Sequence, residues 1–425
     1  MSKLVVMGAG YVGLSSAACF SHLGHDVWCV DINAARINAI LAGEMPIIED
    51  GLPALVDAGI RNGSLRFTTD LAEAADSAEM VFLCVPTPQG ADGSADLSFV
   101  QAAARSLAEL LQPGAVVVNK STVPVGSTKI VEQELQRPDV FVVSNPEFLR
   151  EGTAIYDFLH PDRIVVGADD REIGERVCAL YAGIEAPMLI TDPASAETIK
   201  YAANAFLATK ISYINAVAAI CEGVGADIHD VVLGLGFDKR IGDAFLKPGP
   251  GWGGSCLPKD TSALIKIGEQ VGYDFDLLRG VIVVNEQQYE RVVQKIVNAA
   301  GGILKGKTIG VWGLTFKANT GDLRDSPALR IVGILNESGA IIRAFDPAVD
   351  VLRSNLDGIE LFSTPLDAVE GAEVLVVLTE WEVFKEVSPN DVKSLMKSRN
   401  VVDARNVLEK DAWQQAGFGY QGIGR

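Results

Sequence analysis

The sequence has little positive charge, few histidines and no long hydrophobic run. Lys and Arg number 36 against 55 Asp and Glu, a formal net charge of −19 that repels nucleic acid and anionic membranes on average. The four histidines lack the spacing of zinc ligands, so neither a metal site nor histidine-triad chemistry is expected. No stretch reaches the roughly 18 uninterrupted apolar residues of a membrane span, and the N-terminal residues enter a strand-and-glycine pattern without room for a secretory signal. We therefore expect a cytoplasmic protein that binds neither nucleic acid nor membranes.

The six cysteines show no CxxC pair and no other metal-type spacing. Five of them lie in apolar strand or helix patterns and are predicted to be buried thiols: Cys19, Cys29, Cys84, Cys178 and Cys221. Cys256 differs, because it follows a run of Gly and Pro at 248–254 that cannot form a regular element. A thiol at the start of a helix beside Lys259 should have a lowered pKa and be nucleophilic.

The length of 425 residues suggests about three domains. Apolar strands alternate with amphipathic segments, Leu14–Leu23 and Ala34–Ala42 among them, and this predicts a parallel sheet covered by helices on both faces. The first strands are expected at Leu4–Met7, Val27–Asp31, Met80–Val85, Ala115–Asn119, Val140–Ser144 and Arg163–Gly167. Past Gly301 the alternation returns, with strands expected at Thr308–Trp312, Ile341–Phe345, Val374–Leu378 and Val401–Asp403. The fold class is therefore α/β, with two Rossmann-like doubly wound domains.

A different pattern separates these two domains. Asp192 and Pro193 read as an N-cap followed by proline at the first helical position, and apolar residues then recur at helical spacing until Gly223. One helix of about 30 residues, or two helices broken near Lys210, fits this pattern. We expect domains at residues 1–191, 192–300 (helical, with Cys256) and 301–425. The active site should lie between the outer two, and the long helix should form the interface of a homodimer or higher homo-oligomer.

A dinucleotide-binding turn follows the first predicted strand, with the sequence Gly8-Ala9-Gly10-Tyr11-Val12-Gly13. Gly8 permits the tight turn, Gly10 allows the backbone to approach a pyrophosphate, and Gly13 allows the helix to pack on the sheet. Asp31 closes the next strand and would accept hydrogen bonds from ribose hydroxyls. Because Ile32 and Asn33 offer no cation for a 2′-phosphate, NAD is favoured over NADP, and Arg36 would lie near the adenosine end. The alternative is a glycine turn in an α/β fold without a dinucleotide.

Three short motifs place polar residues four apart: Glu147 and Glu151, Lys200 and Asn204, and Cys256 and Asp260. Each pair taken singly also fits a solvated helix face or a helix cap. Beside a nicotinamide site, a nucleophilic cysteine indicates oxidation of an aldehyde to an acid. A hydride cannot leave a bare aldehyde, so the thiol must first make the carbonyl carbon tetrahedral.

Six segments together resemble the nucleotide-sugar 6-dehydrogenases, in the family's order and from Gly8 to about Arg405. They are GAGYVGL, STVPVGST, NPEFLREG, KYAANAFLATKISYINA, GPGWGGSCLPKD and FKANTGDLRDSP. The resemblance implies a four-electron oxidation of a sugar CH2OH to a carboxylate, which uses two NAD and passes through a thiohemiacetal and a thioester. It also implies that residues 1–191 bind NAD and that residues 301–425 bind the nucleotide sugar. Trp252 departs from the phenylalanine common in relatives, but an aromatic ring is retained.

The resemblance also assigns catalytic roles. Cys256 would be the nucleophile, while Lys200 and Asn204 would hold the developing oxyanion. Asp260 would position a water molecule and keep Lys200 charged.

The remaining catalytic roles concern water. By the same resemblance, Thr122 and Glu151 would organise a proton-accepting water in the first oxidation, and Glu147 would be the base for thioester hydrolysis. Whether Lys200, Asp260 or Glu151 takes the first proton stays open at this point.

The binding positions implied by the resemblance fall into two sets. The cofactor set, in addition to the glycine turn, Asp31 and Arg36, is Pro86, Thr87, Ser121, Thr122, Glu151, Lys259 and Arg324. The substrate set is Glu147, Phe148, Leu149, Arg150, Glu151, Lys200, Asn204, Arg240, Phe245, Lys247, Gly253, Cys256, Phe316, Lys317 and Arg405. Arg240 matches an arginine that reaches a partner subunit's site in relatives. Lys247, Lys317 and Arg405 would supply the positive charge that a diphosphate requires.

The segment Val402–Asn406 resembles UDP-glucose enzymes, in which the residue matching Arg405 meets the sugar. UDP-glucose is therefore the expected substrate, and GDP-mannose and a UDP-N-acetylhexosamine are the alternatives. A one-step hydroxyacid dehydrogenase is a more remote alternative that would need neither Cys256 nor a third domain. An NAD-sensing protein with a dead site would have no use for the set Cys256, Lys200, Asn204 and Asp260.

Overall fold

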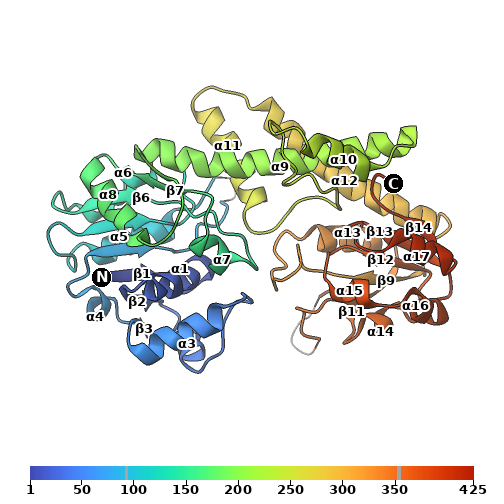
Figure 1. Ribbon diagram of the computed structural model, residues 1–425, viewed down its shortest axis with the longest axis horizontal. Coiled ribbons are helices and arrows are strands. Elements are labelled where there is room, and N and C mark those ends of the chain that lie inside the picture. The colour runs from blue at the N-terminus through green and yellow to red at the C-terminus, as the bar shows by residue number, and fades with distance from the viewer. Residues whose placement is uncertain (91–93, 352–355) are drawn as a thin grey trace. The chain divides into compact units, whose positions relative to one another are not determined.

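The computed structural model describes residues 1–90, 94–351 and 356–425, and the chain divides into two compact units (Figure 1). The first unit comprises Met1–Ala203 and Ser262–Gly272, and the second comprises Asn204–Thr261 and Tyr273–Arg425.

The first unit is built on a sheet of eight strands in the order β3-β2-β1-β4-β5-β6-β7-β8. Their bounds are β1 Lys3–Met7, β2 Asp26–Val30, β3 Leu65–Thr68, β4 Met80–Leu83, β5 Val116–Asn119, β6 Phe141–Ser144, β7 Ile164–Gly167 and β8 Met188–Thr191. The six predicted strands are confirmed to within two residues at either end. The sequence missed β3 and β8, the two edge strands, because neither carries a continuous buried apolar run.

The prediction of an entirely parallel sheet is wrong at one strand pair. β7 runs antiparallel to β6 and shares only the pair Ser144 and Gly167, whereas β8 is parallel to β7. The connection between β6 and β7 contains only α7 (Ala154–Leu159), six residues long. Such a helix rises about 9 Å, less than the roughly 13 Å of a four-residue strand, so it does not carry the chain back for a parallel crossover.

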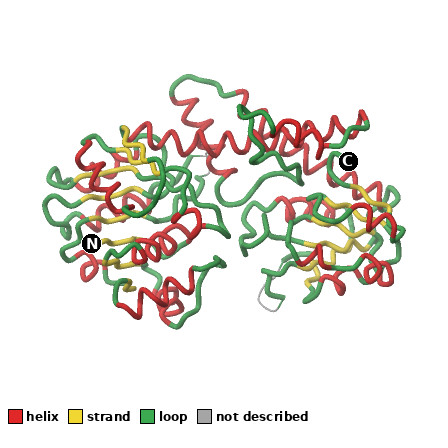
Figure 2. Tube along the Cα trace, in the orientation of Figure 1, coloured by secondary structure: helices red, strands yellow, loops and turns green. Residues whose placement is uncertain are grey.

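Helices cover both faces of this sheet (Figure 2). They are α1 Tyr11–His22, α2 Ala34–Leu41, α3 Leu52–Asn62, α4 Leu71–Ala75, α5 Ser98–Leu107, α6 Ser127–Leu135, α7, α8 Arg171–Cys178 and the 3₁₀ turn η1 Ala179–Tyr181. Strand β1 illustrates the two cores: Leu4 and Val6 belong to one hydrophobic cluster, and Val5 and Met7 belong to the other. The doubly wound prediction is confirmed.

The second unit contains an entirely parallel sheet in the order β11-β10-β9-β12-β13-β14. Its strands are β9 Thr308–Trp312, β10 Ile341–Phe345, β11 Ile359–Leu361, β12 Val374–Val377, β13 Asn400–Asp403 and β14 Gly419–Gln421. The four predicted strands are confirmed to within one residue, and the edge strands β11 and β14, three residues each, were missed. The further helices are α10 Ile228–Gly236, α12 Asp276–Ala299, α13 Pro327–Glu337, α14 Pro365–Val369, α15 Val383–Glu386, α16 Pro389–Leu395 and α17 Lys410–Gln415.

Two helices, α9 (Pro193–Val224) and α11 (Leu257–Gln270), each contribute residues to both units. α9 is one continuous helix of 32 residues, so the alternative of a break near Lys210 is wrong. Asp192 caps it by accepting the Ser195 N–H at 2.8 Å. In the described part of the chain, α9 is the one helix long and apolar enough to cross a membrane by length and composition, which is weak evidence because core helices meet the same criterion.

Candidate active site

The glycine turn after β1 has the geometry that a dinucleotide pyrophosphate requires. Gly8 has φ +105°, and a Cβ there would lie 2.5 Å from the Cys84 carbonyl oxygen. A Cβ on Gly13 would lie 1.8 Å from the Gly8 carbonyl oxygen, so α1 could not pack as it does with any larger residue. Gly10 has nothing within 4 Å of a Cβ, which leaves open space at the N-terminus of α1. Backbone N–H groups and the helix dipole favour phosphate at such a terminus.

Asp31 follows β2 and is fixed by three donors. Its carboxylate accepts hydrogen bonds from the N–H of Ala9 at 2.8 Å, the N–H of Asn33 at 2.9 Å and the Arg36 guanidinium at 2.9 Å. Burial acts to raise the pKa of Asp31, but these hydrogen bonds and the charge of Arg36 hold it below its ordinary value. A fixed carboxylate here accepts ribose hydroxyls and repels a 2′-phosphate, so the residues present fit NAD.

The other predicted cofactor residues divide between the two units. Ser121 donates from its hydroxyl to the carbonyls of Leu83 at 3.1 Å and Val85 at 2.7 Å, which ties the loop after β5 to the loop carrying Pro86 and Thr87. Arg324 and Lys259 belong to the second unit. There Arg324 pairs with Asp322 at 2.6 Å and Lys259 pairs with Asp260 at 2.7 Å.

Glu147 and Lys200 form a buried ion pair in the first unit. Lys200 Nζ lies 2.8 Å from Glu147 Oε1, and the two side chains are 4% and 5% exposed. Glu147 Oε2 accepts the N–H of Leu149 at 2.7 Å. Burial acts to raise the pKa of Glu147, but the charge and hydrogen bond of Lys200, the Leu149 N–H and the charge of Lys120 hold it below its ordinary value. The carboxylate is therefore ionised near neutral pH.

The loop around this pair is rigidly held. The Phe148 ring lies 3.7 Å below the Arg163 guanidinium and 5.5 Å from Lys200 Nζ. Arg150, predicted to bind substrate, is paired with Asp157. Glu49, which the sequence did not indicate, accepts the N–H groups of Gly152 and Ala154 at 2.8 and 2.6 Å and also bonds the Tyr11 hydroxyl. These contacts fix the partly buried Glu151 from both sides along the chain.

Cys256 occupies the residue before α11 in the second unit. Its carbonyl accepts the Asp260 N–H at 2.9 Å, as an N-cap residue does, and the cysteine is partly buried. Four of the other five thiols are buried as predicted, but Cys178 is only partly buried, so that prediction is wrong there. Burial raises the pKa of Cys19 and of Cys84 to about 12, which makes those thiols unreactive.

Asp260, one turn into α11, is completely buried and bonded through both oxygens. Oδ1 accepts Lys259 Nζ at 2.7 Å and Oδ2 accepts Asn204 Nδ2 at 2.6 Å. Lys259 thus lies in direct contact with Asp260, and Lys200 in direct contact with Glu147, while the expected role of Asp260 in keeping Lys200 charged stays a prediction. Lys200 and Asn204 lie one turn apart in α9, as the spacing predicted.

The Gly-Pro loop before Cys256 is held by polar side chains of α9 and α12. Trp252 donates its N–H to Asn285 at 2.9 Å and its indole N–H to Ser212 at 2.8 Å, while its carbonyl accepts Tyr289 at 2.8 Å. These bonds accommodate the tryptophan found where relatives have phenylalanine. Gly249 is held through its N–H by Asn215 and through its carbonyl by Gln288. The sequence did not predict these hydrogen bonds, although polar residues at 285, 288 and 289 on an amphipathic helix could have indicated them.

Several predicted substrate residues converge on this loop. A Cβ on Gly253 would lie 1.9 Å from the Asp325 carbonyl oxygen, and one on Gly254 would lie 2.7 Å from the Phe316 ring. Arg405 donates to the carbonyl of Phe316 at 3.0 Å, and its Nη1 would lie 3.3 Å from a Cβ on Gly249. Three segments distant in sequence thus meet a few residues before Cys256.

The remaining predicted residues are more open. Lys317 Nζ lies 5.7 Å from the Phe316 ring. Phe245 and Lys247 are exposed, and Arg240 is 88% exposed and paired with Asp238 at 2.6 Å. The binding roles expected of these residues stay predictions.

Two Rossmann-like sheets, a dinucleotide turn and a cysteine capping a helix place this protein in the class of nicotinamide-dependent oxidoreductases. The chain belongs to the UDP-glucose/GDP-mannose dehydrogenase family. Residues 2–185 match that family's NAD binding domain, 194–287 its central domain and 310–410 its UDP binding domain.

Full-length relatives support the same assignment. The chain is 45% identical to a UDP-glucose 6-dehydrogenase of Rhizobium meliloti (strain 1021), with 100% of this chain and 99% of the relative covered. It is 44% identical to the UDP-glucose 6-dehydrogenase TuaD of Bacillus subtilis (strain 168), covering 100% and 94%. The structure of a UDP-glucose dehydrogenase from Pyrobaculum islandicum superposes with a TM-score of 0.91 at 37% identity, covering 100% of this chain and 98% of that one.

Proposed function

We propose that this protein oxidises UDP-glucose to UDP-glucuronate with two NAD and one water. The observation that carries the proposal is Cys256 at the N-cap of α11, directly after a loop packed on Phe316 and Arg405. A partly buried thiol at a helix N-terminus is suited to covalent catalysis, which an aldehyde-to-acid oxidation requires.

The chemistry follows from what the chain's own groups can do. When bound, NAD accepts a hydride in each of the two oxidations. Between them, the Cys256 sulfur adds to the aldehyde carbon to form a thiohemiacetal, whose oxidation leaves a thioester. Water then attacks the thioester carbonyl, the C–S bond breaks, and the carboxylate and free thiol are released. Glu147, held ionised by Lys200, takes the proton from that water.

Other side chains stabilise the oxyanion and accept the first proton. Lys200 and Asn204 bind the oxyanion that develops on the substrate carbon's oxygen. Asp260 orients Asn204 through their 2.6 Å hydrogen bond. Thr122 and Glu151 hold the water that accepts the alcohol proton, although Lys200 and Asp260 are also candidates for the first base.

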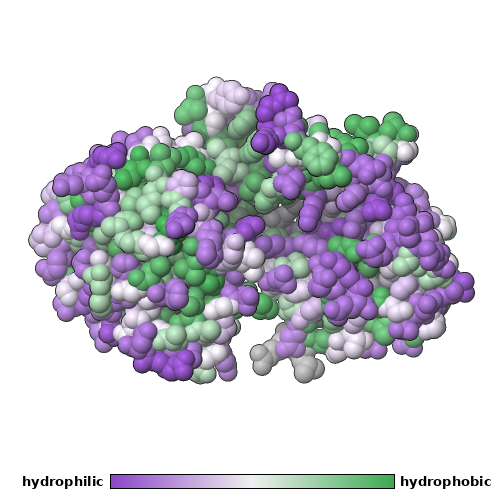
Figure 3. Space-filling view, in the orientation of Figure 1, coloured by the Kyte–Doolittle hydropathy of each residue, from purple (hydrophilic) through white to green (hydrophobic). Residues whose placement is uncertain are grey.

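A second copy of this chain is the proposed partner. Phe206, Tyr213, Ile220 and Val224, here called the α9 stripe, are 56–73% exposed. The first three recur every seven residues on one face of α9, a spacing typical of helix pairing. Leu233 and Phe237 of α10 are also exposed, and Figure 3 shows hydrophobic surface over the C-terminal end of α9. Burying this stripe in a homodimer would remove apolar surface from water.

Three domains and a cytoplasmic location complete the proposal. The boundaries 1–191, 192–300 and 301–425 follow the points where the sequence pattern changes. The formal net charge of −19 is consistent with a soluble protein that does not bind nucleic acid or anionic membranes.

The stoichiometry of NADH formation tests the proposed reaction. Limiting UDP-glucose, GDP-mannose and UDP-N-acetylglucosamine are each incubated with excess NAD and followed to completion. We expect two NADH per UDP-glucose and negligible rates with the other two. One NADH per sugar would indicate a one-step dehydrogenase, and two NADH from either alternative sugar alone would reassign the substrate.

A further inference from the structure

Lys120, directly after β5, is a buried lysine that the proposed chemistry does not use. The residue is 4% exposed. Its Nζ donates to Asn145 Oδ1 at 3.2 Å and to the Tyr181 hydroxyl at 3.2 Å, both neutral groups. Among the described residues, Lys120 forms no ion pair with a carboxylate. A buried charge without a paired counter-charge is costly, so its retention calls for an explanation.

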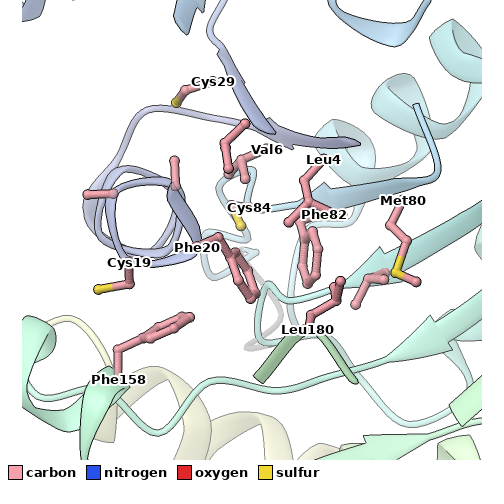
Figure 4. Packing of buried hydrophobic residues seen from close by; sticks show 14 of the residues in the cluster. Leu4, Val6, Cys19, Phe20, Cys29, Met80, Phe82, Cys84, Phe158 and Leu180 are labelled. Carbon is pink, nitrogen blue, oxygen red and sulfur yellow. The ribbon is translucent and has the colours of Figure 1, made fainter. Parts of the chain in front are cut away.

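The surroundings of this ammonium group are largely apolar. Its Nζ lies 5.8 Å from the ring of Phe158 and 5.8 Å from that of Tyr181, and both rings belong to the hydrophobic cluster that includes Cys19 and Cys84 (Figure 4). Burial, with a smaller contribution from the charge of Lys200, lowers the pKa of Lys120 to about 8, although Cys84, Glu147 and Cys19 act to raise it. At neutral pH most Lys120 side chains are therefore protonated.

Lys120 is joined to the Glu147 loop through Asn145. Asn145 donates its N–H to the Asn119 carbonyl at 2.8 Å and its Nδ2 to the Val165 carbonyl at 2.8 Å, and its Oδ1 accepts both Lys120 and Tyr181. Glu147 lies two residues further along the chain. The carboxylate of Glu147 therefore experiences two ammonium groups, Lys200 by direct contact and Lys120 at longer range through its charge.

We propose that Lys120 is a positioning residue for the reaction, fixing Asn145 at the start of the Glu147 loop and supplying a second positive charge near the Glu147–Lys200 pair. With two ammonium groups acting on it, Glu147 stays ionised as the proposed base requires. The inference rests on the proposed role of Glu147 as a base. The titratable groups that face Lys120 from the elements around it are Cys19, Cys84, Glu147, Tyr181 and Lys200.

The test is the pH dependence of kcat. Activity should rise with pH as Glu147 ionises, and removing a nearby cation raises the pKa of that carboxyl group. We expect Lys120→Met to move the acidic limb of the kcat profile upward by about one pH unit, while Lys120→Arg leaves it close to that of the unmodified enzyme. Tyr181→Phe is the matched control, because it removes the hydroxyl that bonds both Lys120 and Asn145 without changing charge. Lys120→Gln, which keeps a polar head of similar reach, serves if the methionine variant does not fold.

The outcomes separate this inference from the proposed role of Glu147. An acidic limb that stays in place in Lys120→Met or Lys120→Gln, or that shifts equally in Lys120→Arg or Tyr181→Phe, would overturn the positioning role. Glu147→Gln should abolish the limb. If the limb persists there, Glu147 is not the base, and the role of Lys120 fails with it.

Discussion

Lys200 and Glu147, 53 residues apart in sequence, form a 2.8 Å ion pair in which neither side chain is more than 5% exposed. The pair joins α9 to the loop after β6, so it connects the helix that carries Asn204 to the loop that carries Glu151. Breaking such a pair leaves one buried charge uncompensated, which costs more than removing both charges.

The first prediction concerns this pair and stability. Lys200→Met should lower the free energy of unfolding at pH 7 by about 3–5 kcal/mol, because Glu147 is left buried and unpaired. The double variant Lys200→Met/Glu147→Gln should recover most of that loss yet remain inactive. Urea denaturation together with an NADH assay measures both effects, and equal stability of the single and double variants would argue against the pair.

The pH dependence of this stability has a definite sign. The folded-state pKa of Glu147 lies below its ordinary value of 4.5, so its ionisation stabilises the fold above that value. The contribution is lost as the pH falls through the lowered pKa. Unfolding curves from pH 7 to pH 3 should show a steeper acid loss in the unmodified protein than in the double variant, and parallel curves would contradict this.

Cys256→Ser should lower kcat by at least about a thousandfold and abolish the yield of two NADH per UDP-glucose. Serine keeps the side-chain size but is a far weaker nucleophile at neutral pH. Cys178→Ser is the matched control, since Cys178 is the other partly buried thiol and lies in the first unit. A Cys256→Ser enzyme that still produces two NADH would exclude a thioester.

Asp31→Ala should raise the KM for NAD by about tenfold or more, because hydrogen bonds to a charged group are lost, and it should weaken discrimination against NADP. The KM for UDP-glucose should change little. Asp26→Ala removes a carboxylate from the other end of β2, where it pairs with Arg66 at 2.5 Å, and should leave both constants unchanged. The prediction fails if the two variants behave alike.

Gly253→Ala should displace the loop before Cys256, because its Cβ would lie 1.9 Å from the Asp325 carbonyl oxygen. We expect kcat/KM for UDP-glucose to fall by at least about tenfold, and stability to fall by about 1–3 kcal/mol, with the KM for NAD unchanged. Gly234→Ala on α10 meets nothing within 4 Å and should be neutral or slightly stabilising. Unchanged UDP-glucose kinetics in Gly253→Ala would show that the loop tolerates the shift.

Tyr213→Asp and Ile220→Asp should weaken self-association by at least about thirtyfold, since each places a charge in the centre of the α9 stripe. Sedimentation velocity over a range of protein concentrations measures the effect. Leu277→Asp, at a residue on α12 that is 68% exposed, is the control and should leave association intact. If the unmodified protein sediments as a monomer, the proposed homodimer is wrong, but the proposed chemistry is not affected.

The elements that the sequence predicted well are those whose signal is local. Continuous apolar runs marked the central strands, the Asp192-Pro193 start marked α9, and the glycine spacing marked the turn after β1. The short edge strands β3, β8, β11 and β14 lack such runs, because only part of each faces a core. The antiparallel direction of β7 depends on how short α7 is, which residue pattern alone did not reveal.

Within the candidate site, the sequence by itself determined the residue types and their spacing. It predicted Lys200 and Asn204 on one turn of helix and Cys256 at the start of another. Tertiary structure alone decided the pairing of Lys200 with Glu147 and of Lys259 with Asp260, and the burial of Lys120 against Asn145 and Tyr181. Most of these partners are far apart along the chain, and which of them meet depends on how strands, helices and loops pack. Which charges pair in a buried site is set by that packing, because burial removes water from the charged groups. An ion pair then stabilises the fold only where the surrounding residues hold both partners in contact.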